Sequence, residues 1–304
     1  MDRQKVLAIV GPTGIGKTSL SVWLAKQLDG EIISCDSMQV YKKMDIGTAK
    51  VTREEMQGIH HELIDVQNYN EPYNVKVFQE KCRTAIEDVV KRGKFPILCG
   101  GTGLYLKAAL YDYEFQEENE DIAYTTFLNS KTNEELVAML KEKDEKALEK
   151  IHPNNRKRLI RALQICHSGT SKSEQEDKQQ HIPLYDVYFL GLDVNRDILH
   201  DRINKRVDIM FENGLVKEVE ELFSNPETWE YTSFQGIGYK EFKDYFLKEK
   251  SIDEVKTAIK THSRQYAKRQ YTWFKNQMPV HWFEAQNRDE IYSAVKEWLM
   301  DEDK

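Results

Sequence analysis

The octapeptide at residues 11–18, Gly-Pro-Thr-Gly-Ile-Gly-Lys-Thr, fits the pattern G-x-x-x-x-G-K-[S/T] and follows an apolar run at residues 6–10. In this pattern the glycines let successive backbone N–H groups turn inward around phosphate oxygens, and the following helix adds the positive end of its dipole. Lys17 supplies a point charge, and the hydroxyl of Thr18 is placed to meet Mg²⁺. The sequence therefore predicts a phosphate-binding loop made of Gly11, Pro12, Thr13, Gly14, Ile15, Gly16, Lys17 and Thr18.

Strand and helix patterns alternate on both sides of this loop. Short apolar runs at residues 6–10, 31–35 and 95–99 are typical of buried parallel strands. Amphipathic patterns over 17–28 and 78–91 predict helices between them, and residues 187–193 and 280–283 predict two more strands. We expect an α/β fold, a doubly wound parallel sheet of the kind found in P-loop NTPases.

The pattern changes in the middle of the chain. Residues 112–121 are acidic and weakly patterned, and residues 132–151 are charged and helical. His-Pro-Asn-Asn at 152–155 ends that helix and supplies a cap for the next one, over 156–167. We therefore expect an α/β core of residues 1–111 and 185–304, interrupted by a small helical domain over 112–184.

Composition excludes several classes of protein. The four cysteines form no C-x-x-C pair, so a zinc site or a disulfide framework is not expected and a reducing compartment fits. No apolar stretch approaches the roughly 20 residues that cross a bilayer, and the first strand begins too early for a leader peptide. The net charge of −7 argues against a generic nucleic-acid coat but not against a local basic groove. We expect a cytoplasmic protein and a monomer.

Asp36 is the acidic residue best placed for chemistry. Most ATPases and GTPases with this loop place a metal-binding Asp after an apolar strand, but here the strand at 95–99 runs into two glycines. Asp36 follows the strand at 31–35, and the carboxyl ends of parallel strands meet at one edge of a sheet. A lone Asp there is often a turn residue. Beside bound phosphates it is instead placed to orient and deprotonate a nucleophile.

Basic residues gather in three places in this acidic chain. They are Arg156, Lys157, Arg158 and Arg161; Arg202 and Arg206; and a stripe over 260–275 that alternates with aromatic residues. Any one such group is usually a solvated helix face, but three of them suggest local binding of a polyanion. Arg202 and Arg206 have a second reading, as cationic caps on a diphosphate.

Taken together, these segments resemble the tRNA dimethylallyltransferase (tRNA isopentenyltransferase) family along nearly the whole chain. The carrying segments are the loop at 11–18, Asp-Ser-Met-Gln-Val-Tyr at 36–41, Met-Asp-Ile-Gly-Thr-Ala-Lys at 44–50, Gly-Gly-Thr-Gly-Leu-Tyr at 100–105, 151–154 with 158–163, 234–240, and 266–270 with 272–274. The resemblance implies a transferase active in tRNA modification. It implies transfer of a dimethylallyl group from dimethylallyl diphosphate, with Mg²⁺, to the N6 amine of the adenine 3′ of the anticodon.

The resemblance also implies roles for individual residues. By similarity, Asp36 is the base that contacts the amine, and Lys17 and Thr18 act with it on the diphosphate. Arg202 or Arg206 meets the diphosphate, and the helical insertion binds tRNA. The residues implied in tRNA binding are Asp36, Ser37, Met38, Gln39, Thr102, Lys157, Arg158, Leu159, Ile160, Arg161, Gln235, Gly236, Ile237, Gly238, Tyr239 and Lys240.

The chain departs from the family pattern in two segments. Residues 60–65 read His-His-Glu-Leu-Ile-Asp in place of the usual Pro-His-His-Leu-Ile-Asp, and residues 119–129 contain no Arg or Lys. Three alternatives stay open. They are a shikimate- or nucleotide-kinase type of phosphotransferase, an adenylate isopentenyltransferase, and a nucleotide-gated RNA-binding protein. Turnover of ATP without RNA would favour the phosphotransferase, and use of a free nucleotide would favour the adenylate isopentenyltransferase. Absence of donor consumption would favour the RNA-binding protein.

Overall fold

Parallel strands form one six-stranded sheet in the computed structural model, which describes residues 3–115, 121–169, 171–174 and 181–301. The sheet consists of β1 (Lys5–Val10), β2 (Gly30–Ser34), β3 (His61–Glu62), β4 (Phe95–Gly100), β5 (Asp186–Asp193) and β6 (His281–Glu284). Its spatial order is β3-β2-β4-β1-β5-β6, and every neighbouring pair is parallel. The predicted parallel α/β sheet is confirmed. The two-residue strand β3 gave no apolar run in the sequence and was not predicted.

Strand β1 is buried on both faces. Val6, Ala8 and Val10 pack into one core, and Leu7 and Ile9 pack into a second core on the other side of the sheet. Helices α3 (Val75–Lys91) and α4 (Gly103–Leu110) cover the first face, and α1 (Lys17–Leu28) and α13 (Arg288–Met300) cover the second. A strand buried on both faces must be apolar at every position, which explains the unbroken run in the sequence.

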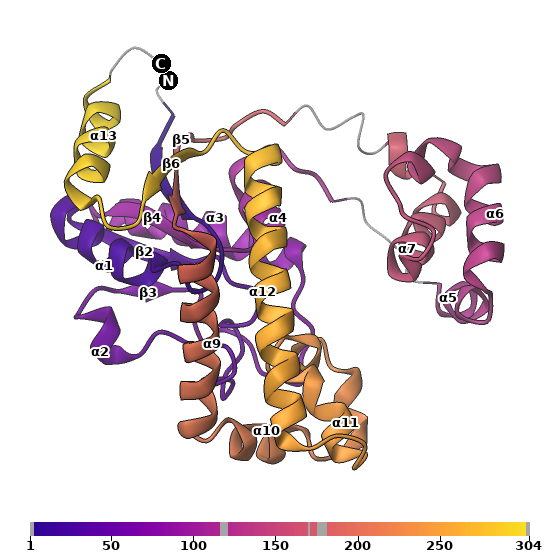
Figure 1. The fold of residues 1–304 in the computed structure, drawn as a ribbon. Helices are drawn as coiled ribbons and strands as arrows, with labels where there is room; N and C mark the ends of the chain where they lie inside the picture. The colour runs from indigo at the N-terminus through magenta and orange to yellow at the C-terminus, as the bar shows by residue number, and fades with distance from the viewer. Residues whose placement is uncertain (1–2, 116–120, 170, 175–180, 302–304) are drawn as a thin grey trace. The chain divides into compact units, whose positions relative to one another are not determined.

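The C-terminal part of the chain adds helices beside the sheet. Helices α9 (Arg196–Glu212) and α12 (Ile252–Gln277) run side by side (Figure 1). The chain passes from α9 to α12 through α10 (Leu215–Phe223), η2 (Pro226–Glu230), η3 (Ser233–Gln235), η4 (Lys240–Phe242) and α11 (Lys243–Phe246). A short helix, α2 (Arg53–Met56), precedes β3. The first strand and the last helix meet, because Lys5 Nζ donates to the carbonyl oxygens of Trp298, Leu299 and Asp301 at 2.9, 3.0 and 2.7 Å.

The chain divides into two compact units. The first comprises residues 1–111 and 183–304, and the second comprises residues 112–182. The second unit contains α5 (Ile122–Asn129), α6 (Asn133–Asp144), η1 (Glu145–Glu149) and α7 (Arg156–His167) around a core of its own, formed by Leu128, Leu136, Leu140, Ala147, Ile151, Leu159, Ala162 and Leu163.

The helices predicted over 17–28 and 156–167 have the predicted bounds as α1 and α7. The helix predicted over 132–151 is interrupted. Asp144 leaves the helical conformation, with φ −157°, and its Oδ1 accepts a hydrogen bond from the backbone of Ala147 at 3.2 Å, which starts a 3₁₀ turn. Within the described ranges, no helix combines the length and the apolar character needed to cross a membrane.

The carboxyl ends of β2 and β4 approach too closely for a side chain at one position. A Cβ added to Gly100 would overlap the backbone of Cys35, which follows β2. The backbone cannot give way as a side chain can, so we expect Gly100→Ala to lower the free energy of unfolding by about 1–3 kcal/mol. Urea denaturation of the variant and the wild type measures this loss, and an unchanged free energy of unfolding would contradict the backbone clash.

Candidate functional site

The phosphate-binding loop lies between β1 and the first turn of α1, the strand-to-helix position that the sequence pattern predicts. Gly14 and Gly16 have φ of 79° and 105°, a left-handed conformation that residues with a Cβ rarely adopt. The Nζ of Lys17 donates to the carbonyl oxygens of Gly11 and Pro12 at 2.9 and 2.8 Å. Burial lowers the pKa of Lys17 to about 8, while Asp36 is among the groups that oppose this shift.

One cavity of about 710 Å³ opens beside this loop in the first unit. Its lining includes most of the residues predicted to bind phosphate, namely Thr13, Gly14, Gly16, Lys17, Thr18, Arg202 and Arg206. It also includes two of the predicted acceptor residues, Asp36 and Gln39. Gly11, Pro12 and Ile15 belong to the loop but do not line this cavity. The fold thus brings residues that are distant in the sequence to one cavity.

Both predicted arginines reach the loop from α9. Arg206 donates to Thr13 Oγ1 at 3.2 Å and to the carbonyl oxygens of Thr48 and Ala49 at 3.5 and 3.3 Å. Arg202 donates to the carbonyl oxygen of Ile15 at 3.4 Å. Burial lowers the pKa of Arg206, and the Asp36 carboxylate opposes this shift. Arginine still stays charged at neutral pH, so a half-buried cation faces the cavity.

Asp36 stands just past the carboxyl end of β2. Its Oδ1 accepts hydrogen bonds from the backbone N–H groups of Met38 and Gln39 at 2.8 and 3.3 Å. This local turn fixes the carboxylate, as Asp side chains do at strand ends. No hydrogen bond to its Oδ2 occurs among the described residues, so that oxygen can accept a proton from a ligand in the cavity.

Helix α12 contributes two cavity residues to which the sequence assigned no role, Tyr266 and Gln270. Gln270 accepts from the backbone N–H of Thr13 at 2.9 Å and donates to the carbonyl oxygen of Gly101 at 2.9 Å, so it ties α12 to the loop and to the end of β4. Burial, with a contribution from Asp36, raises the pKa of Tyr266 to about 12, which keeps its hydroxyl protonated. A polar residue on the buried stripe Val255, Ile259, Ala267, Gln270 and Phe274 was the available signal.

The remaining predicted residues lie outside the cavity lining. Thr102 precedes α4, and its backbone N–H donates to the carbonyl oxygen of Cys35 at 3.4 Å. Ser37 and Met38 belong to the turn that follows β2, and Gly236 packs so closely on Met38 that a Cβ there would overlap it. Lys157, Arg158, Leu159, Ile160 and Arg161 lie on α7, in the second unit.

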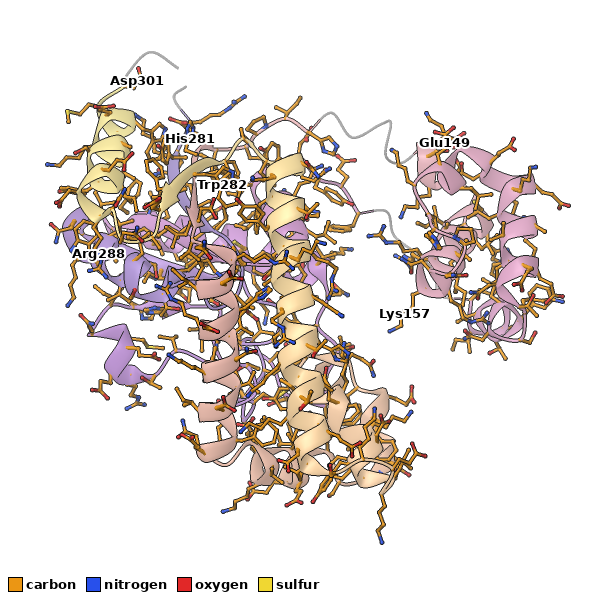
Figure 2. The ribbon with its side chains drawn as sticks, in the orientation of Figure 1. Glu149, Lys157, His281, Trp282, Arg288 and Asp301 are labelled. Carbon is orange, nitrogen blue, oxygen red and sulfur yellow. The ribbon has the colours of Figure 1, made fainter. Side chains whose placement is uncertain are left out.

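Two residues of the predicted tRNA-binding segments have fully buried side chains. Leu159 belongs to the core of the second unit, and Tyr239 is buried beneath the turn at residues 44–50. Their side chains do not reach the surface, so they support their segments from inside. In contrast, Lys157, Arg158 and Arg161 are exposed on α7, and Figure 2 shows the Lys157 side chain projecting from that helix.

Oxygen atoms suited to Mg²⁺ line the same cavity. Thr18 offers a hydroxyl in the first turn of α1, and Asp36 offers a carboxylate. Mg²⁺ prefers oxygen ligands and ordinarily keeps water and substrate phosphate oxygens among them. This donor set fits a cation that arrives with a diphosphate.

A second group of potential metal ligands, Glu31, His60 and Glu62, lies at the β2–β3 edge of the sheet. Arg92 already pairs with Glu31 and Glu62 at 2.6 and 2.8 Å. The guanidinium already occupies both carboxylates, and we assign no metal to them.

Arg206 is the more deeply embedded of the two arginines, because it contacts both the loop and the 48–49 carbonyls. We expect Arg206→Ala to weaken binding of inorganic diphosphate by roughly 10- to 100-fold, the effect of losing charge-assisted hydrogen bonds. Arg202→Ala should have the smaller effect. Isothermal titration calorimetry of both variants checks this order, and a larger loss for Arg202→Ala would contradict it.

The lowered pKa of Lys17 makes diphosphate binding depend on pH. Below pH 8 the ammonium is present and attracts the anion. As the pH rises through 8, the free protein loses this charge and the affinity for diphosphate falls, by at most about tenfold per pH unit. Titrations between pH 7 and 9.5 test this, with Lys17→Met as the control, because that variant keeps the titration of diphosphate itself but lacks the ammonium group. The same pH dependence in the wild type and in Lys17→Met would refute the assignment.

The chain matches a family model described as IPP transferase over residues 39–277. It is 49% identical over 301 residues to a tRNA dimethylallyltransferase of Bacillus anthracis, covering 97% of this chain and 96% of the relative. A crystal structure of the tRNA isopentenylpyrophosphate transferase from Bacillus halodurans is 41% identical, with a TM-score of 0.75, covering 98% of this chain and 97% of that one. A structure of a eukaryotic dimethylallyltransferase acting on tRNA is 31% identical, with a TM-score of 0.82, covering 98% of this chain and 78% of that one.

Proposed function

The chain belongs to the IPP transferase family, as one of its tRNA dimethylallyltransferases, and on that premise we propose the reaction that it catalyses. It moves a dimethylallyl group from dimethylallyl diphosphate to the exocyclic N6 amine of the adenine 3′ of the anticodon. The product is N6-isopentenyladenine in tRNA. The enzyme is a transferase of tRNA modification, and we expect it to act as a monomer in the cytoplasm.

One observation carries this proposal. The cavity joins an anion site, formed by the loop with Lys17, Arg202 and Arg206, to a fixed carboxylate, Asp36. The strand beside the loop, β4, ends in Cys99 and Gly100, and Gly101 follows it, so no metal-binding acid stands there. A group transfer in which diphosphate leaves and a nucleophile loses a proton needs both of these parts.

The diphosphate is the leaving group, so the enzyme must stabilise the charge that develops on it. Lys17 and the two arginines supply fixed positive charges for this purpose. The backbone N–H groups of the loop add the positive ends of their dipoles. When bound, Mg²⁺ adds charge that stabilises the departing diphosphate, and Thr18 would hold it. The bond between C1 of the dimethylallyl group and the bridging oxygen breaks, and its electron pair leaves with the diphosphate.

The acceptor amine forms the new bond to C1 and must lose a proton. The free Oδ2 of Asp36 takes that proton while the backbone N–H groups of Met38 and Gln39 hold Oδ1. The adenine has to leave its stack to enter the cavity, as bases do in enzymes that modify them. Gln39 and Tyr266 line the cavity beside Asp36 and offer polar contacts to the flipped base.

The second unit supplies contacts to the tRNA backbone. Lys157, Arg158 and Arg161 are exposed on α7, and their positive charges can pair with phosphates although the whole chain carries −7. The predicted segment 235–240 contributes its exposed residues, Gln235 and Lys240.

The direct test is incubation with dimethylallyl diphosphate, Mg²⁺ and unmodified tRNA, followed by mass analysis of the nucleosides. We expect N6-isopentenyladenosine in tRNA, and none in a tRNA whose adenine at that position is replaced. AMP is tested in parallel as acceptor. Prenylation of AMP but not of tRNA would indicate an adenylate isopentenyltransferase, and ATP turnover without RNA would indicate a phosphotransferase.

Asp36→Asn keeps the shape of the turn but loses the carboxylate that accepts the amine proton. We expect kcat to fall by roughly 10²–10⁴-fold, the usual effect of losing a general base, with tRNA affinity nearly unchanged. Single-turnover kinetics at saturating tRNA separate the two effects. If the variant binds tRNA poorly but turns over normally once saturated, Asp36 is a binding residue and the base lies elsewhere.

Replacing Arg158 and Arg161 together by Ala should weaken tRNA binding and flatten its dependence on salt. Each lost phosphate contact removes roughly 0.7–0.9 from the slope of log affinity against log salt. The Michaelis constant for the donor should barely move, because neither residue lines the cavity. Equal slopes for the wild type and the double variant would mean that this face of α7 is only solvated.

A further inference from the structure

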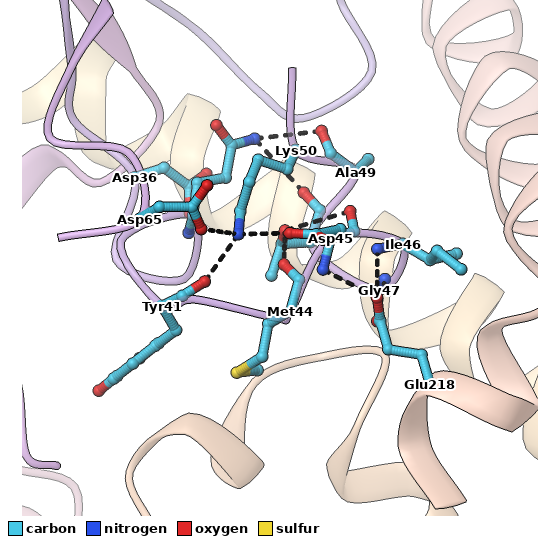
Figure 3. A network of polar contacts seen from close by, with 12 residues as sticks. Asp36, Tyr41, Met44, Asp45, Ile46, Gly47, Ala49, Lys50, Asp65 and Glu218 are labelled. Carbon is cyan, nitrogen blue, oxygen red and sulfur yellow. Dashed lines mark hydrogen bonds and ion pairs between the residues drawn. The ribbon is translucent and has the colours of Figure 1, made fainter. Parts of the chain in front are cut away.

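Glu218, on α10, binds the backbone of a turn that borders the cavity. Its Oε2 accepts from the N–H groups of Asp45 and Ile46 at 2.8 and 2.7 Å, and its Oε1 accepts from the N–H group of Gly47 at 3.0 Å (Figure 3). Successive N–H groups that converge in this way form a nest, a structure that binds anions. Here the anion is a carboxylate of the same chain, so the nest serves to fix the turn at residues 44–50.

The carboxylate of Glu218 is itself held in place by Tyr239. The hydroxyl of Tyr239 donates to its Oε1 at 2.8 Å, and the Tyr239 ring lies so close under Gly47 that a Cβ at that glycine would overlap it. Burial, with the charge of Glu218, raises the pKa of Tyr239 far above its usual value, so the phenol remains a donor. Each oxygen of Glu218 therefore accepts two hydrogen bonds.

The other end of the turn is held by Lys50. Its side chain is 6% exposed, and its Nζ donates to the carbonyl oxygen of Tyr41 at 2.7 Å. The same Nζ pairs with the carboxylates of Asp45 and Asp65 at 2.7 and 2.5 Å (Figure 3). Both ends of the turn are thus attached to the body of the first unit.

Between these anchors the turn presents two carbonyl oxygens, those of Thr48 and Ala49. Arg206, which also contacts Thr13 of the phosphate-binding loop, donates to them at 3.5 and 3.3 Å. Gln39 donates to the same oxygens from the Asp36 side at 3.4 and 3.2 Å. Ala49 has φ +44°, a left-handed conformation that is unfavourable for a residue with a Cβ, so this geometry depends on outside support.

We propose that Glu218 is a positioning residue for the transfer reaction: it holds the turn at 44–50 so that the carbonyls of Thr48 and Ala49 keep Arg206 and Gln39 in place. Glu218 itself does not line the cavity and touches no reacting group. This role rests on the proposed function, in which Arg206 serves the donor and Gln39 the acceptor.

Glu218→Gln is the informative substitution. It keeps the length of the side chain but turns one acceptor oxygen into an NH₂ group. Whichever position that group takes, it faces two donors: either the N–H groups of Asp45 and Ile46, or the N–H group of Gly47 and the hydroxyl of Tyr239. The turn should loosen, and Arg206 should lose the carbonyls that orient it. Glu221→Gln is the matched control, because Glu221 is exposed on the same helix and pairs only with Lys217 among the described salt bridges.

The test is a double-mutant cycle on the binding of inorganic diphosphate, measured by calorimetry. We expect Glu218→Gln to weaken binding about tenfold in the wild-type background and less than twofold in the Arg206→Ala background, because the effect passes through Arg206. Glu221→Gln should bind as the wild type does. Equal losses in both backgrounds, or no loss in either, would overturn the proposal.

Kinetics with dimethylallyl diphosphate and tRNA add a second readout. A positioning role raises the donor KM and lowers kcat, whereas a loss of folded protein only scales kcat with the active fraction. If Glu218→Gln does not fold, Tyr239→Phe removes one of the four hydrogen bonds. It should shift diphosphate affinity about threefold in the same direction, and again only where Arg206 is present; no shift would overturn the proposal. The binding cycle needs no group transfer, so a wild type that fails to prenylate tRNA would refute the proposed function without deciding the role of Glu218.

Discussion

The pairing of β1 with β4 on one side and β5 on the other is the constraint on which the rest of the structure depends. Val10 lies opposite Gly100 of β4 and Gly191 of β5, so the three strands end at one edge of the sheet. Parallel strands place their loops together at that edge, and the loop at 11–18 occupies its centre. The small residues opposite Val10 let the chain pass closely there, where a larger residue at Gly100 would meet the backbone of Cys35.

The cations and the carboxylate of the cavity depend on one another. Lys17 and Arg206 are both buried enough that their charged forms are disfavoured, and Asp36 opposes the shift in each. A diphosphate would supply the remaining negative charge. The carboxylate that we propose as the acceptor of the amine proton therefore also helps to keep the anion site charged. This couples the two halves of the proposed reaction through electrostatics rather than through direct contact.

Two kinds of support hold this arrangement in place. Gln270 connects α12 to the loop and to the end of β4, across 257 and 169 residues of sequence. Glu218 and Lys50 hold the turn at 44–50, whose carbonyls meet both Arg206 and Gln39. The segment at 235–240, predicted to bind tRNA, takes part in this support through Tyr239, while its exposed ends remain available for contacts with RNA.

The sequence by itself determined the features that a few neighbouring residues encode. The loop at 11–18 follows from spacing alone, and Asp36 follows from its place after a strand. The helices α1 and α7 have their predicted bounds because their apolar periods and flanking glycine or asparagine residues are local. Only the tertiary structure decided that Arg206 reaches deeper than Arg202 and that β3 pairs at the edge of the sheet. It also decided that Gln270 lines the cavity and that Glu218 holds the turn beside it. Their partners lie far along the chain, and a hydrogen bond between distant residues leaves no periodic signal in the sequence around either one.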